Sequence, residues 1–60
     1  MNNPKNATAE QQQILENASS ILYTCRNTIG NFEEKEVIKS DGHYYRLRAC
    51  NKRITEFMEV

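Results

Sequence analysis

The dipeptide Asp41-Gly42 stands between two alternating stretches and constrains the fold more than any other feature of this chain. A two-residue hairpin turn of type I′ needs positive φ at both central positions, and Asp-Gly adopts it readily. We therefore predict an antiparallel hairpin of two strands, about 35–40 and 43–50. The turn sets the strand register as Ser40 with His43, Lys39 with Tyr44, Ile38 with Tyr45, Val37 with Arg46 and Glu36 with Leu47.

The two faces of this hairpin differ in chemistry. Because side chains alternate along a strand, the apolar face is expected to carry Ile38, Tyr45, Leu47 and Ala49. The opposite face is aromatic and cationic and is expected to carry Val37, Lys39, Tyr44, Arg46 and Arg48. This contrast is typical of a sheet with one face against the core and one face in water.

The stretch before Gly30 has helical periodicity. Thr8 and Gln11 form a capping-box pattern that marks a helix start, and Gly30 is suited to a left-handed cap at its end. The apolar residues between them recur at spacings of three and four, namely Ile14, Leu15, Ala18, Ile21, Leu22, Cys25 and Ile29. We predict a helix over about 9–29. Its apolar stripe suits packing on the sheet, a helical seam with a second chain, or both.

The last ten residues fit a third strand at about 53–59, after a turn at Asn51-Lys52. As a short helix they would have basic residues in the first turn and an acidic one in the last, against the helix dipole. The strand pairs would be Ala49 with Ile54, Tyr45 with Met58, Arg46 with Phe57 and Tyr44 with Glu59. Ile54, Met58 and Val60 would then extend the apolar face, whereas Glu56 would be a misfit opposite Leu47.

The expected fold class is therefore α+β, with one N-terminal helix packed on a three-stranded antiparallel β-meander. The alternative is a helix, a β-hairpin and a short C-terminal helix. Residues 1–7 are expected to be a disordered tail, and 8–60 a single small domain, because 60 residues leave no room for a second one.

A core this small often gains stability from a partner, frequently a second copy of the chain. The predicted helix is longer than a short sheet, so part of its stripe would remain uncovered. We expect Ile14, Ala18 and Ile21 to form this dimer or partner surface, which predicts a homodimer.

Several function classes are disfavoured by the composition. Ser40, Asp41 and His43 are catalytic residue types, but consecutive positions in a tight turn diverge, so no enzyme is predicted. No metal-ligand spacing or phosphate loop is present, and no cofactor is expected. No apolar run is long enough for a membrane span or export signal, and Cys25 and Cys50 are expected to be reduced thiols. A cytoplasmic location follows, with no membrane partner.

The expected function is that of a small non-enzymatic binding module, a regulator or inhibitor acting by protein–protein interaction. Its candidate binding residues are Lys39, Tyr44, Arg46, Arg48 and Phe57. Tyrosine and arginine are favoured at protein interfaces. Aromatic residues interleaved with cations also suit single-stranded nucleic acid, so a nucleic-acid-binding regulator is the alternative. The small size and balanced charge are typical of bacterial or bacteriophage accessory proteins.

Overall fold

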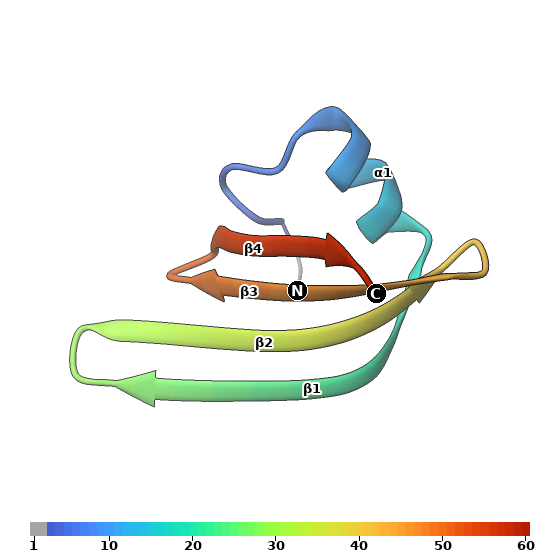
Figure 1. The fold of residues 1–60 in the computed structure, drawn as a ribbon. Helices are drawn as coiled ribbons and strands as arrows, with labels where there is room; N and C mark the ends of the chain where they lie inside the picture. Colours follow the sequence, from blue (N-terminus) through green and yellow to red (C-terminus); the bar gives the residue numbers. More distant parts are fainter. Residues whose placement is uncertain (1–2) are drawn as a thin grey trace.

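The computed structural model describes residues 3–60 and shows one helix followed by a four-stranded antiparallel sheet (Figure 1). The elements, in chain order, are α1 (Ala9–Glu16), β1 (Ala18–Thr28), β2 (Asn31–Ser40), β3 (His43–Cys50) and β4 (Arg53–Glu59). Each strand pairs with the next one along the chain, in the order β1-β2-β3-β4. The predicted α+β class, with an N-terminal helix and an antiparallel meander, is confirmed.

The helix is much shorter than the sequence predicts, and the prediction of a helix over 9–29 is wrong. The capping box of Thr8 and Gln11 is present, but the helix ends at Glu16 and β1 begins two residues later. The segment 18–28 is rich in Ser, Thr, Ile and Tyr, which are weak helix formers and mostly favour strands. As a strand it also gives the outer side of β2 a hydrogen-bonding partner, so that side of the ladder is satisfied.

The central hairpin has the predicted register. Asp41 and Gly42 both have positive φ, 51° and 82°, and every predicted β2–β3 pair is present. β2 begins at Asn31, four residues before the predicted start, because its first half pairs with β1. The turn between β1 and β2 is formed by Ile29 and Gly30, with Gly30 at φ 81°.

The strand β4 is also confirmed, with bounds equal to the predicted 53–59, but its register shifts after Ile54. Ala49 pairs with Ile54, as predicted, and Arg48 then pairs with Glu56, so that Thr55 is the extra residue of a β-bulge. A shift of one residue exchanges the two faces of a strand. The later pairs are therefore Leu47 with Phe57, Arg46 with Met58 and Tyr45 with Glu59, in place of the predicted ones.

The bulge corrects the predicted faces of two residues and removes the misfit of the unbroken register. Phe57 joins Leu47 on the core side, whereas Met58 leaves it. Glu56, which an unbroken strand would place opposite Leu47, lies instead on the cationic side opposite Arg48. The bulge thus places the Glu56 carboxylate on the cationic side, although the core face itself buries two other carboxylates, Glu34 and Glu36.

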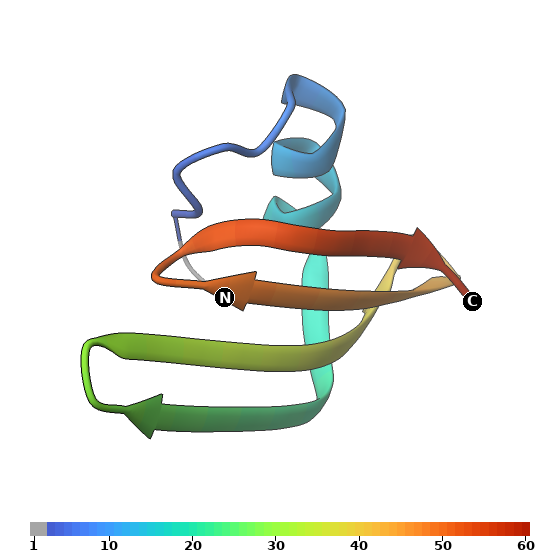
Figure 2. The ribbon, with the colours of Figure 1, turned by 60° about the vertical axis from the view of Figure 1, so that its left-hand side comes forward.

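The core face of the sheet carries the buried apolar residues Ile38, Leu47 and Ala49. The helix is tied to this face where β2 ends, because the Ser40 hydroxyl donates a hydrogen bond of 2.9 Å to the carbonyl of Ile14. In both ribbon views α1 lies beyond β4, and the chain then crosses to the opposite margin to continue as β1 (Figures 1 and 2). β1 bends where its register shifts, between Ser20 and Leu22.

The N-terminal segment is attached to the start of β4. The Asn6 side chain donates to the carbonyl of Ile54 (3.0 Å) and accepts from its backbone N–H (2.6 Å). The backbone N–H of Lys5 donates to the carbonyl of Lys52 at 2.8 Å. These contacts lie within the stretch 1–7 predicted as a tail, of which residues 1–2 lie outside the described residues. Among residues 3–60, no helix is long and apolar enough to cross a membrane.

Candidate binding face

The side of the sheet opposite the core face, called the open face below, concentrates the positive charge of the chain. By strand alternation it carries six of the eight Lys and Arg residues, and only two of the eight acidic ones, Glu33 and Glu56. The six cations are Arg26, Lys35, Lys39, Arg46, Arg48 and Arg53. A chain with a formal net charge of zero therefore has one sheet face of strongly positive charge.

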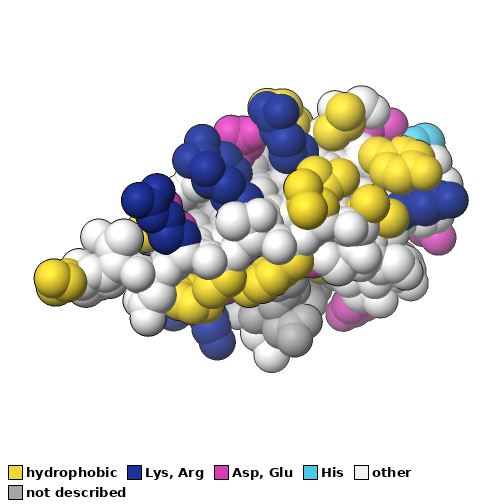
Figure 3. All heavy atoms as spheres, turned by 90° about the horizontal axis from the view of Figure 1, so that it is seen from below, with side chains coloured by type: hydrophobic (Ala, Val, Ile, Leu, Met, Phe, Trp, Pro, Cys, Tyr) yellow, Lys and Arg dark blue, Asp and Glu magenta, His cyan; other side chains and the backbone are white. Residues whose placement is uncertain are grey.

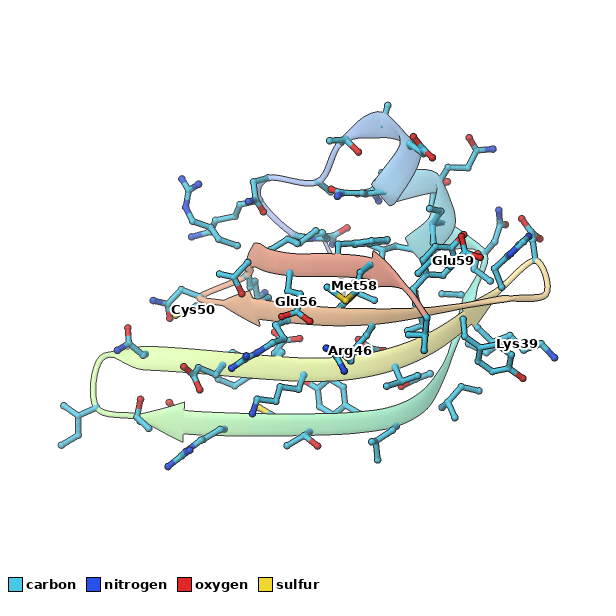
Figure 4. The ribbon with its side chains drawn as sticks, viewed as in Figure 1. Lys39, Arg46, Cys50, Glu56, Met58 and Glu59 are labelled. Atoms are coloured by element: carbon cyan, nitrogen blue, oxygen red, sulfur yellow. The ribbon has the colours of Figure 1, made fainter. Side chains whose placement is uncertain are left out.

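Arg46 and Arg48 differ in how far their charges are neutralised. Arg46 Nε lies 3.2 Å from Glu56 Oε1, and its Nη2 lies 3.9 Å from Met58 Sδ. Figure 4 shows these three side chains close together at the centre of the sheet. Arg48 also lies opposite Glu56, but its side chain has no hydrogen bond or ion pair to any residue of the described part of the chain. Its guanidinium is exposed and available to a partner.

The aromatic part of the predicted site is divided between the two faces. Lys39 Nζ lies 5.6 Å from the centre of the Tyr44 ring, a cation–π contact on the open face. Phe57 is on the core face, with its ring 5.7 Å from that of Tyr45. The predicted site residues Lys39, Tyr44, Arg46 and Arg48 therefore lie together, and Phe57 does not belong with them.

An open depression of about 310 Å³ lies in the middle of this face. Its lining combines apolar and charged side chains, namely Leu22, Thr24, Lys35, Glu36, Val37, Arg46, Leu47, Arg48 and Glu56. Leu22 is 60% exposed, and it faces half-buried Val37 across the β1–β2 pair. The depression therefore offers an apolar surface next to cations, which suits a side chain from a segment that also carries negative charge.

The residues near the β2–β3 turn are engaged in structural contacts. Ser40 is buried and its hydroxyl donates to the carbonyl of Ile14. His43 Nδ1 lies 2.9 Å from Glu59 Oε2, and both side chains are more than half exposed. Ser40 and His43 thus have different partners, one on α1 and one on β4.

The predicted partner surface on the helix is corrected by the fold. Ile14 lies on α1, whereas Ala18 and Ile21 lie on β1, so the three residues share no helical stripe. Cys25, expected on that buried stripe, is exposed on β1. Cys50 is half-buried at the end of β3, and both thiols are free.

Arg26 and Leu22 also belong to the open face, although the helical periodicity of the sequence predicts both in a helix. The only signal that could have found them is the run of strand-forming residues around them. Glu56 was missed because it reaches this face through a bulge, for which the sequence of β4 contains no glycine or other marker.

Comparison of the chain with protein-family models, with curated proteins and with solved structures finds no match. The geometry of the open face is therefore the basis for a functional proposal.

Proposed function

We propose that this protein is a small non-enzymatic binding module whose open face docks on an acidic segment of another protein. The observation that carries the proposal is the separation of charge, with six of eight cations on one uncovered sheet face. Arg48 supplies a free guanidinium for a carboxylate, and the central depression receives an apolar side chain. We place this activity in the cytoplasm, where Cys25 and Cys50 would stay reduced.

An acidic protein segment is favoured over single-stranded nucleic acid because of where the aromatic rings lie. Nucleic-acid platforms stack successive bases on aromatic side chains. Tyr44 is an aromatic residue of the open face, but Phe57 packs against Tyr45 on the other side of the sheet.

Fluorescence anisotropy with two labelled probes tests the proposal. One probe is a peptide of Glu and Asp with a single central Leu, and the other is a thymidine oligonucleotide. We expect the peptide to bind more tightly than the oligonucleotide at both about 50 and about 200 mM salt. Tighter binding of the oligonucleotide, with a steep loss of affinity over this range, would support the nucleic-acid alternative. Binding of neither probe would contradict both.

The double variant Arg46→Ala and Arg48→Ala identifies the surface. We expect it to weaken peptide binding about thirtyfold, as expected for truncation of interface arginines. Its free energy of unfolding should stay within about 2 kcal/mol of the parent, because both side chains are exposed. The matched control, Lys5→Ala with Lys52→Ala, removes two positive charges away from the open face and should bind like the parent. Equal losses in both variants would mean that only net charge matters.

A further inference from the structure

The outer edge of β1 is an unprotected pairing edge. β1 and β4 are the two edge strands of the sheet, and within residues 3–60 no strand pairs with the outer side of either. β1 has eleven residues, of which all after Ala18 are exposed. Its outer backbone N–H and C=O groups therefore form a row that another strand can join. Figure 3 looks onto this edge, where hydrophobic side chains lie beside the Lys and Arg side chains of the open face.

The other edge strand, β4, is better protected than β1. β4 has seven residues, a bulge at Thr55 and three charged side chains, and Asn6 occupies the backbone of Ile54. β1 contains a single charged residue, Arg26, and no proline. Natural sheets normally block their edges with short strands, charges, bulges or covering segments. In β1 the register shift lies at the start of the strand, between Ser20 and Leu22, and Arg26 is its single charge. From Leu22 to Thr28 the edge is therefore long, regular and open to pairing.

The regular part of β1 is suited to pairing with itself. After the register shift, Leu22–Thr28 pairs with β2 without interruption, and Cys25 is the midpoint of this stretch. If two copies of β1 pair antiparallel about a two-fold axis at Cys25, all seven residues of this uninterrupted stretch take part in the pairing. Cys25 then faces its own copy, Thr24 faces Arg26, Tyr23 faces Asn27 and Leu22 faces Thr28. No pair in this register places like charges opposite each other, which would be destabilising.

We propose that the occupant of this edge is a second copy of the chain, paired antiparallel through β1 with the two Cys25 residues opposite each other. A two-fold axis perpendicular to the sheet keeps the open faces of both copies on the same side. The small core supports this choice, because within residues 3–60 the buried apolar residues are Ile38, Leu47 and Ala49 alone. The pairing rests on β1 alone, whatever the open face binds.

The dimer would also complete the binding face. Thr24 lines the depression on the open face. In the proposed register, Arg26 of the second copy lies opposite Thr24 and adds a cation to the margin of this depression. By symmetry the first copy does the same for the second. Two depressions and their cations would then form one continuous positive surface.

Sedimentation equilibrium of the full chain and of Cys25→Lys tests the pairing. Within one chain, residue 25 lies opposite Glu34, so a lysine there meets an acid and should not harm folding. Across the two-fold axis it would meet the same lysine of the second copy. We expect a concentration-dependent dimer for the parent and an increase of about tenfold in the dissociation constant for the variant. The matched control Thr55→Lys, on the other edge, should dimerise like the parent.

Cross-linking provides an independent measurement. In the Cys50→Ser variant Cys25 is the remaining thiol, so a short bismaleimide should join two chains through it in high yield. The proposal would be overturned if the parent is a monomer at the highest soluble concentration. It would also be overturned if the parent dimer is unchanged by Cys25→Lys and is not cross-linked by the bismaleimide. If Cys25→Lys becomes monomeric but still binds the acidic peptide, the dimer is supported separately from the proposed function. If the parent is a dimer but does not bind the acidic peptide, only the proposed function is contradicted.

Discussion

Strands β1 and β3 both pair with β2, one on each side, but they are held in place differently. β1 has eleven residues and none of them is buried, whereas the eight residues of β3 include buried Leu47 and Ala49. β3 is therefore fixed by a hydrogen-bonded ladder and by apolar burial, and β1 by its ladder alone. A ladder exposed to water opens more readily than a packed one, so we expect β1 to have the lower local stability.

The largest expected effect separates the two strands directly. Leu47 is fully buried, so Leu47→Asp places a carboxylate in the core and should unfold the domain. Leu22 on β1 is 60% exposed, so Leu22→Asp should fold and melt within about 1 kcal/mol of the parent. Circular dichroism melts of both variants measure this difference. A folded Leu47→Asp variant, or an unfolded Leu22→Asp variant, would contradict the stated difference between β3 and β1.

A smaller effect tests whether the β3 side depends on the bulge in β4. Deleting Thr55 removes the extra residue and leaves the pairs of Glu56, Phe57 and Met58 unchanged, so stability should change by about 1 kcal/mol or less. Deleting Phe57 moves Met58 opposite Leu47 and removes the ring that contacts Tyr45, at a cost of about 2 kcal/mol or more. Urea unfolding of the two deletions should therefore rank them clearly. The reverse order would show that the strand register differs from the one described.

The smallest effect is confined to alkaline pH and concerns β1. Desolvation, together with Cys25 and Glu34, raises the pKa of Tyr23 from 10.0 to about 12. The fold thus favours the protonated phenol, so its stabilising effect is complete below pH 10 and is lost as the pH rises towards 12. The melting temperature should fall over this range, and Tyr23→Phe should reduce the fall. Tyrosinate absorbance at alkaline pH checks the assignment, since the variant should lose one late-titrating tyrosine, while Tyr45, whose pKa is also raised by desolvation, still titrates late. An unchanged profile would show that Tyr23 is not held in this way.

Local chemistry made the centre of the fold predictable. Asp41-Gly42 sets its own turn geometry and, through it, the pairing of β2 with β3. The capping box at Thr8 likewise depends only on residues within one helical turn. The cationic row of Lys39, Arg46 and Arg48 followed from this register, because alternation along a paired strand needs no further information.

The strand β1 and the register of β4 could not be predicted, because they depend on interactions between strands that sequence periodicity does not report. In β1 the apolar residues do not face a core, so their spacing of three and four carries no structural meaning there. The deciding interaction is the ladder with β2, which joins residues across the turn at Ile29 and Gly30. In β4 the bulge at Thr55 places Glu56 opposite Arg48 and Phe57 opposite Leu47, a pairing across strands that periodicity within β4 does not report. That single residue moved Phe57 out of the predicted site.

The clasp between Asn6 and Ile54 gives the chain a definite order of assembly. All sheet pairings join strands that are neighbours along the chain, and each closes through a short turn, so they can form early and fast. The clasp joins residues 48 positions apart and adds little energy until both turns between β2 and β4 exist. During synthesis on the ribosome, the segment around Asn6 would therefore emerge before the sheet and be fixed after it. We expect the backbone amide of Ile54 to gain protection from hydrogen exchange after those of the central hairpin.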